Sequence, residues 1–182
     1  MDYALRKAKL QDRHDLEALI VRSARQLGAQ DYTAEQTEGA LRGAFGVDTQ
    51  LIEDGTYFVV ESEGRIVGCG GWSRRRTLFG GDRHTERSVA ELDPRTEAGK
   101  IRAFFVDPEH ARKGIGTAIL RQCETDARSF GFSRLELMST LPGARLYKQH
   151  GYLPGAPINY ELAPGLTIEF IPMSKTLCRA DE

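Results

Sequence analysis

The stretch 104–120 combines residues whose types and spacing suit the binding of a polyphosphate. It predicts a buried strand, an Asp-Pro turn, and a loop containing Gly114 and Gly116 that opens an amphipathic helix. Glycines let the backbone approach phosphate oxygens closely, and the first N–H groups of a helix have no internal partner and favour negative charge. Arg112 and Lys113 add positive charge at the same place. We therefore predict an anion site where this strand meets this helix.

The familiar phosphate motifs do not describe this loop. It has no third glycine for a dinucleotide fingerprint, and Lys113 precedes Gly114 instead of following a glycine as in a P-loop. A nucleotide-binding switch protein is disfavoured as well, because no magnesium-ligand or base-recognition motif accompanies the glycines.

A second pattern, Ala-Arg-Leu-Tyr-Lys-Gln-His-Gly-Tyr, occupies 144–152. Together with the aromatic-Val-Asp-Pro strand end and the Gly-Ile-Gly loop, it resembles the GNAT acyltransferase superfamily, whose members move an acyl group from coenzyme A to an amine. The resemblance is strong across 99–153, loose over 1–75, and absent as a motif between 76 and 98. It implies one α/β GNAT domain over residues 1–182, with a mixed, mainly antiparallel sheet of about seven strands and about four flanking helices.

The resemblance implies that the acyl donor, acetyl-CoA, binds on both sides of the Asp-Pro turn. The strand before the loop is expected to separate from its neighbour, so that Phe104, Phe105 and Val106 bind the pantetheine arm like an added strand. The backbone N–H groups that would hold the pyrophosphate belong to Arg112, Lys113, Gly114, Ile115, Gly116 and Thr117. The chain departs from the family at Ala111, where Gln or Arg is usual, and Arg112 is placed to supply that contact.

Tyr147 is the candidate catalytic residue. It matches the family tyrosine that lies near the thioester sulfur and protonates the departing thiolate. A thiol and a phenol have ordinary pKa values of about 8.5 and 10, so sharing a proton between them costs little. The asparagine that commonly braces the pantetheine amides is missing, and its place falls to Thr140 or Ser139; alternatively, both hydroxyls cap the helix expected to begin near Gly143. Tyr152 is predicted to be a core residue.

A general base is harder to name. The family often takes a Glu from the central strand or from the strand after the long helix, but these positions hold Lys100 and Leu135. Glu136 lies one residue off, which turns its side chain to the other face of the strand. His84 and Glu86, in the long polar segment, are alternatives. Ordered water is a further one.

Two residues are weak candidates for contact with the acceptor, His84 and Arg102. If Arg102 converges with one of Arg74 to Arg76, the pair would hold a carboxylate or phosphate of the acceptor. The alternative is that these arginines form surface ion pairs with Glu91, Asp93 or Glu97. We expect the segment 74–99 to form part of the acceptor site, because it is long, polar, and leads into the donor-binding strand.

The composition sets the class of protein in which these residues act. The chain has 182 residues, 40% of them hydrophobic, and a net charge of -1, so we expect one domain and neither nucleic acid nor membrane as a partner. Its start lacks a signal-peptide pattern. Cys69, Cys123 and Cys178 are odd in number and lack metal-ligand spacing, which favours a metal-free protein of the reducing cytoplasm.

Hydrophobic periodicity and turn residues predict the elements that position these side chains. Strands are expected at 3–9, 57–61, 65–72, 100–106, 134–138, 158–162 and 166–173, and helices at 12–28, 33–45, 114–130 and 143–150. Thr33 and Gln36 have the spacing of a capping box. The strand–helix–strand order across 100–138 predicts one parallel pair in an otherwise antiparallel sheet.

These observations predict an enzyme that transfers an acetyl group from acetyl-CoA to a primary amine by direct attack. The alternative is a catalytically weak CoA-binding or partner-binding module of the same fold, since the usual Glu and Asn are missing. The acceptor is a small molecule or a peptide, and small amines, aminoglycosides, polyamines, peptide N-termini and lysines all remain open. The sequence also leaves a homodimer open.

Overall fold

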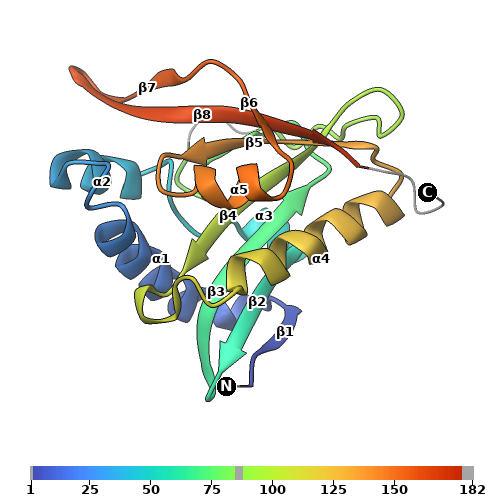
Figure 1. Ribbon diagram of the computed structural model, residues 1–182, viewed down its shortest axis with the longest axis horizontal. Helices are drawn as coiled ribbons and strands as arrows, with labels where there is room; N and C mark the ends of the chain where they lie inside the picture. Colours follow the sequence, from blue (N-terminus) through green and yellow to red (C-terminus); the bar gives the residue numbers. More distant parts are fainter. Residues whose placement is uncertain (1, 85–87, 178–182) are drawn as a thin grey trace.

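The computed structural model describes residues 2–84 and 88–177, which are built on a single sheet of eight strands (Figure 1). The strands follow the order β1-β2-β3-β4-β5-β8-β6, and β7 also pairs with β8. Among the described pairs only β4 and β5 run parallel, as the sequence predicted. The strands are β1 Ala4–Lys7, β2 Tyr57–Ser62, β3 Arg65–Ser73, β4 Gly99–Val106, β5 Arg134–Thr140, β6 Leu153–Pro154, β7 Ile158–Ala163 and β8 Leu166–Thr176.

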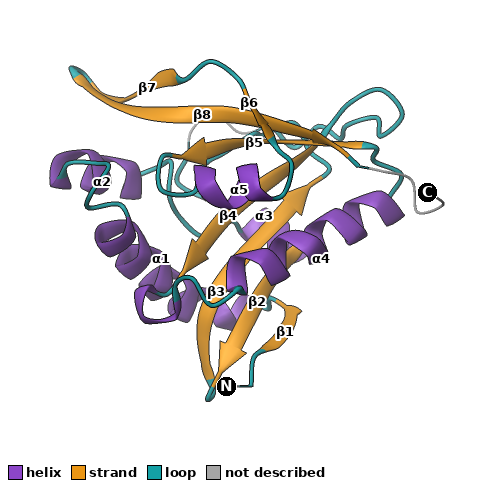
Figure 2. Ribbon diagram, viewed as in Figure 1, coloured by secondary structure: helices purple, strands orange, loops and turns teal. Residues whose placement is uncertain are grey.

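Helices cover both faces of this sheet (Figure 2). The α-helices are α1 Arg13–Leu27, α2 Ala34–Leu41, α3 Thr49–Glu53, α4 Ile115–Ser129 and α5 Ala144–Gln149, and the short 3-10 helices are η1 Leu10–Asp12 and η2 Pro108–His110. One core cluster joins α4 and α5 to the sheet through residues such as Trp72, Cys123 and Leu135. The other joins α1, α2 and α3 to the opposite face. The central strands are therefore buried on both sides.

The close approach of α4 to β3 depends on a glycine. A Cβ atom at Gly68 would lie 2.4 Å from Cγ2 of Ile115, the first residue of α4. Ile115 itself is 2% exposed, so it cannot move away without opening the core. This contact fixes the start of α4, and with it the glycine loop, against the sheet.

The elements differ from the sequence-based expectations in three places. The sheet has eight strands and not about seven, because the two-residue β6 is too short to leave a pattern. Helix α3 was not predicted, since its five residues cannot show helical periodicity. Helix α2 has the predicted Thr33–Gln36 capping box but ends at Leu41, where the chain turns and the Phe45 N–H donates to the Ala40 carbonyl at 2.8 Å.

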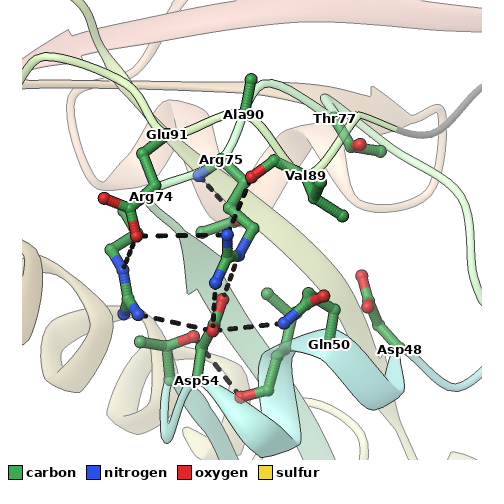
Figure 3. Close-up of polar contacts among 12 residues, drawn as sticks. Asp48, Gln50, Asp54, Arg74, Arg75, Thr77, Val89, Ala90 and Glu91 are labelled. Carbon is green, nitrogen blue, oxygen red and sulfur yellow. Dashed lines mark hydrogen bonds and ion pairs between the residues drawn. The ribbon is translucent and has the colours of Figure 1, made fainter.

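The segment between β3 and β4 folds back on itself. The Arg76 N–H donates to the Ala90 carbonyl at 3.0 Å, and the Leu92 N–H donates to the Arg74 carbonyl at 2.8 Å. The arginine run is held in ion pairs: Arg75 and Arg74 converge on the nearly buried Asp54, with Arg75 Nε at 2.8 Å from its carboxylate (Figure 3).

These contacts settle the role of the arginine run. Arg74 also contacts Glu91 at 3.2 Å, and Arg76 contacts Glu97 at 2.7 Å. The hydrogen bond from Arg75 is the main reason that the pKa of Asp54 is lowered. Arg74 to Arg76 thus form ion pairs, with Glu91 and Glu97 as expected but also with Asp54, which was not expected. Arg102 is instead ion-paired with Asp48.

Two sequence-based candidates, Glu86 and Cys178, lie outside the described residues. The described cysteines, Cys69 and Cys123, are both buried. Within the described ranges, no helix is both long enough and apolar enough to cross a membrane.

Candidate active site

Strands β4 and β5 pair over only a short distance and then separate. Their parallel register holds at Gly99–Leu135 and Lys100–Glu136 and is not continued toward Val106. Gly99 permits this pairing, because a Cβ atom there would lie 3.0 Å from a methyl group of Leu135. Beyond Lys100, the edge of β4 that faces β5 therefore has no strand partner among the described residues.

A bulge in β4 accompanies the separation. The β3–β4 register passes from Cys69–Phe105 to Gly71–Arg102, so β4 contains one more residue than β3 over this interval. Ala103, inside the bulge, has a φ of 55°, which is unusual for a residue with a side chain. Such a conformation persists only where the surroundings hold it.

Residues of β2 and β3 hold the bulge in place. The Tyr57 hydroxyl donates to the Ala103 carbonyl oxygen at 3.2 Å, and the Cys69 sulfur lies 3.8 Å from the same oxygen. Both side chains are 0% exposed. Burial raises the pKa of Tyr57 well above its usual value and that of Cys69 to about 12, so both keep their protons. The Ala103 carbonyl is therefore fixed toward β2 and β3.

This orientation turns two backbone N–H groups toward the gap between β4 and β5. In a trans peptide the N–H points away from the preceding carbonyl, so the Phe104 N–H points away from β3. The Asp107 N–H donates to Val67 of β3 at 2.9 Å, and because strand N–H groups alternate in direction, that of Val106 faces the gap as well. The gap is thus lined with available donors.

The glycine loop has the geometry of an anion site. Arg112 and Gly114 have φ values of 66° and 83°, and Gly114 is the N-cap of α4. The Ala118 N–H donates to the Gly114 carbonyl at 2.9 Å. The preceding N–H groups, including that of Gly116, begin the helix and have no intrahelical partner. Arg112 and Lys113 are exposed, as expected of side chains that meet a charged ligand in solvent.

The glycine loop is also held firmly from behind. The buried Asp107 carboxylate accepts from Arg22 of α1 at 2.9 Å and from the Glu109 N–H at 3.0 Å. Despite the opposing effect of burial, these hydrogen bonds lower the pKa of Asp107. Its charge therefore persists near neutrality and ties the turn before the loop to α1.

One cavity of about 740 Å³ runs along the separated edge of β4 and joins these features. On one side of β4 it is lined by residues of the glycine loop, including Arg112, Gly114, Gly116 and Thr117. On the other side it reaches α1, the 44–46 turn and residues 78–80. The predicted donor strand, glycine loop and long segment thus meet in one cavity. A site of this size suits a small organic ligand.

Tyr147 lines this cavity from α5. Its ring packs at 6.0 Å from that of Phe104 and at 5.7 Å from that of Tyr152. Among the described residues its hydroxyl has no hydrogen-bond partner, which leaves it available to a ligand. Burial raises its pKa, so the phenol stays protonated through the neutral range. Proton donation by Tyr147 is therefore less favourable than the ordinary pKa of a phenol suggests. Tyr152 is 1% exposed, and its prediction as a core residue is confirmed.

Two hydroxyls complete this side of the cavity. Thr140 lines the cavity, and its hydroxyl accepts from the Gly143 N–H at 3.2 Å. Gly143 is itself the N-cap of α5, which has no side-chain cap, so neither Thr140 nor Ser139 caps this helix. The hydrogen of the Thr140 hydroxyl remains for another acceptor. Ser139 is buried and donates to the Thr140 carbonyl at 2.7 Å. Thr117 also lines the cavity, and its hydroxyl lies 3.1 Å from Nε2 of His150, whose pKa is lowered by burial.

The described candidates for a general base, Glu136 and His84, do not line the cavity. Glu136 is ion-paired with Lys100 at the point where β4 and β5 still pair, and neither residue lines the cavity. His84 is 8% exposed and packs against Phe79 with the two rings tilted and their centres 5.0 Å apart. Among the described residues that line the cavity, Asp31 at the end of α1 is the one carboxylate.

Arg102 lies in the cavity wall in a buried ion pair. Its side chain is 2% exposed, and its Nη2 lies 2.7 Å from the carboxylate of Asp48, which is 0% exposed. It also donates to the carbonyls of Thr77 and Gly80. The bulge places Arg102 on the same face as Ala103, so β4 can send a charged side chain into this layer. Its charge is balanced by Asp48.

No pattern in the sequence indicates the bulge or the residues that support it. A single extra residue in β4 leaves no pattern in the sequence, and Tyr57 and Cys69 look like ordinary strand residues. Asp48 was also not singled out. A signal for the close packing was present in Gly70 and Gly71: a Cβ atom at Gly70 would lie 2.6 Å from the Phe104 ring.

The fold and this site can be compared with known proteins. The model of the acetyltransferase (GNAT) family matches residues 16–152, so the chain belongs to the GNAT acetyltransferase family. A comparison with curated protein sequences gives no match.

Solved structures with the same fold include several N-acetyltransferases. A GCN5-related N-acetyltransferase from Rhodopseudomonas palustris has a TM-score of 0.71 at 20% identity, with 97% of each chain covered. PaiA N-acetyltransferase from Thermoplasma acidophilum, solved with coenzyme A, has a TM-score of 0.65 at 13% identity, covering 97% of this chain and 99% of its own. YncA from Salmonella typhimurium, a putative acetyltransferase solved with acetyl-CoA, has a TM-score of 0.64 at 18% identity, covering 100% and 98%.

The buried Arg102–Asp48 pair leads to a first prediction. Arg102→Met removes the ion-pair partner 2.7 Å from a carboxylate that is 0% exposed, so the free energy of unfolding should fall by about 3–5 kcal/mol. Arg102→Met combined with Asp48→Leu should recover at least half of that loss, because an apolar side chain then replaces the buried carboxylate. Denaturant unfolding of the three proteins gives both values. A loss below about 1 kcal/mol for the single variant would show that the pair does not organise this layer.

Proposed function

We propose that the protein transfers an acetyl group from acetyl-CoA to a primary amine by direct attack. The observation that carries this proposal is the edge of β4 that separates from β5. This edge, the glycine loop and Tyr147 all line the same cavity. An extended pantetheine arm would add to β4 as a strand. The pyrophosphate would then lie at the N-terminus of α4. Membership in the GNAT family and the CoA-bound neighbours support the choice of donor.

The Phe104 N–H, fixed by the Ala103 bulge, donates to the thioester oxygen as the amine nitrogen bonds to the carbonyl carbon. When the carbon–sulfur bond breaks, the Tyr147 hydroxyl donates its proton to the leaving sulfur. The proton released by the amine returns to Tyr147 through water. Because the pKa of Tyr147 is raised, this donation is coupled to the bond breaking and does not precede it.

A direct attack is favoured over a covalent enzyme intermediate. A cysteine nucleophile needs a thiolate, and burial raises the pKa of both described cysteines. Cys123 lies on the core face of α4 and is 0% exposed. Neither Cys69 nor Cys123 lines the cavity.

The anion site predicts the effect of removing one side chain. Arg112→Gly deletes a charge beside the loop while Gly adopts the same positive φ freely, so the stability of the free protein should hardly change. The Kd for CoA should rise by about 10-fold, as for one lost charge-assisted contact. Calorimetric titration measures it. The matched control is Glu63→Gly, another residue with positive φ (50°), at the β2–β3 turn. An equal effect in both variants would contradict the assigned anion site.

Tyr147→Phe tests the proposed function most simply. It removes the proton donor and keeps the ring packing, so kcat should fall by about 10- to 1000-fold with little change in the Kd for acetyl-CoA. For the unmodified protein, kcat should not decline with rising pH up to about 10, because Tyr147 with its raised pKa keeps its proton there. Release of free CoA from acetyl-CoA and amine measures turnover. Tight CoA binding with no transfer to any amine would instead favour a CoA-binding module without catalysis.

Tyr57→Phe tests the support of the bulge. Without the hydroxyl the Ala103 carbonyl keeps only the longer contact with the Cys69 sulfur, so the Phe104 N–H should be held less firmly and should polarise the thioester less. The infrared carbonyl frequency of bound, ¹³C-labelled acetyl-CoA should move toward its value in water, and kcat should fall by about 10-fold. Tyr3→Phe, a change of the same type outside the cavity, is the control. An unshifted frequency in Tyr57→Phe would mean that the bulge holds its shape without this residue.

A further inference from the structure

The part of the cavity on the α1 side of β4 is aromatic. Its lining includes Leu27, Tyr32, Phe45, Leu78, Phe79 and Phe170. The rings support one another: Phe79 packs edge-on against Phe170 with ring centres 5.7 Å apart, and Phe45 against Phe105 at 5.8 Å. Phe79 and Phe105 are only half-buried, so apolar ring surface remains open to the cavity. Such surface favours a ligand that is itself apolar.

Residues around Phe79 hold this surface in a fixed position. The carbonyls of Thr77 and Gly80, on either side of Phe79, accept from the buried Arg102. The Tyr160 ring lies 4.9 Å from that of Phe79, and the His84 ring packs against it. The Phe79 ring is therefore held in place as part of the cavity wall.

The charges in this half of the cavity are unsuited to an anionic acceptor. Arg102 is the one cationic side chain there among the described residues, and Asp48 already balances its charge at 2.7 Å. Asp31, near the C-terminal end of α1, is exposed and lines the cavity. Among the described residues of this half, an acceptor carboxylate or phosphate would thus meet no cationic side chain other than Arg102, which is already ion-paired, and desolvating it there is costly.

We infer that the acceptor is a primary monoamine carried on an aromatic group and without an acidic group, such as an arylalkylamine. This inference rests on the proposed acetyl transfer. The aromatic group packs against Phe79 and Phe105, and the amine reaches the thioester beside the β4 bulge. An apolar environment disfavours an ammonium ion and thereby increases the neutral, nucleophilic fraction of the amine. This explains how the site works with no carboxylate base on β4 or β5.

The test compares four acceptors that differ in one property at a time. Phenethylamine carries the ring and the amine, phenylalanine adds a carboxylate, spermidine has several cations and no ring, and a lysine-containing peptide presents an amine on a polar chain. We expect kcat/KM for phenethylamine to exceed that of each of the others by at least about 100-fold. CoA release is measured at a fixed, saturating acetyl-CoA concentration.

The variant Phe79→Ala identifies the surface that selects the acceptor. It should lower kcat/KM for phenethylamine by about 10- to 100-fold and leave the Kd for acetyl-CoA unchanged. Phe130→Ala removes a half-exposed ring outside the cavity, beside Trp72, and should have no such effect. Phe79→Leu, which keeps an apolar side chain, replaces Phe79→Ala if the latter does not fold, and should show a smaller loss of the same kind.

Each outcome decides the inference. Faster transfer to phenylalanine, spermidine or the peptide, or equal loss in Phe79→Ala and Phe130→Ala, overturns the aromatic acceptor and leaves the acetyltransferase function standing. Binding of acetyl-CoA without transfer to any of the four amines overturns the inference, and it overturns the proposed catalysis as well if aminoglycosides and peptide N-termini are also not acetylated.

Discussion

The backbone of β4 must find partners for its polar groups, and past Lys100 the described part of the chain supplies strand partners on one edge only. The β3 ladder holds one side, while the parallel pairing with β5 ends after two residue pairs. N–H groups of a central strand that are left without a protein partner are costly unless water or a ligand satisfies them. The cavity along β4 gives a ligand access to this edge. A ligand bound there can accept hydrogen bonds from the N–H groups of β4, as a neighbouring strand would.

The bulge connects this edge to the chemistry. Ala103 keeps its positive φ because Tyr57 of β2 and Cys69 of β3 hold its carbonyl toward those strands. The Phe104 N–H is thereby turned into the gap between β4 and β5. The same extra residue sends Arg102 into the layer of α1, where its pairing with Asp48 and its bonds to residues 77–80 fix the aromatic wall. One local irregularity thus arranges both the donor and the acceptor side. An apolar acceptor surface favours the neutral amine, which is consistent with the lack of a cavity-lining carboxylate on β4 and β5.

Much of this arrangement could be predicted from local sequence. The glycine loop, α4, the capping box at Thr33 and the single parallel pair each leave a short-range pattern. The bulge, Asp48 and the support by Tyr57 could not be predicted, because they depend on which side chains meet across the sheet. Glu136 shows the same limit: local sequence predicts the face of the strand on which its side chain lies, but its ion pair with Lys100 is apparent only in the folded chain. The polarity of the segment 74–99 is apparent in the sequence, but the position of Phe79 in the cavity wall is not.

The most direct test of this account is amide hydrogen exchange at Phe104 and Val106, measured by NMR with and without saturating acetyl-CoA. If the pantetheine arm adds to β4 as a strand, exchange of these two amides should slow by at least about 10-fold on binding, since they gain hydrogen-bond partners. Amides already bonded to β3, such as that of Asp107, should change far less. Bound acetyl-CoA that leaves exchange at Phe104 and Val106 unaltered would contradict the central claim that the separated edge of β4 is the donor site.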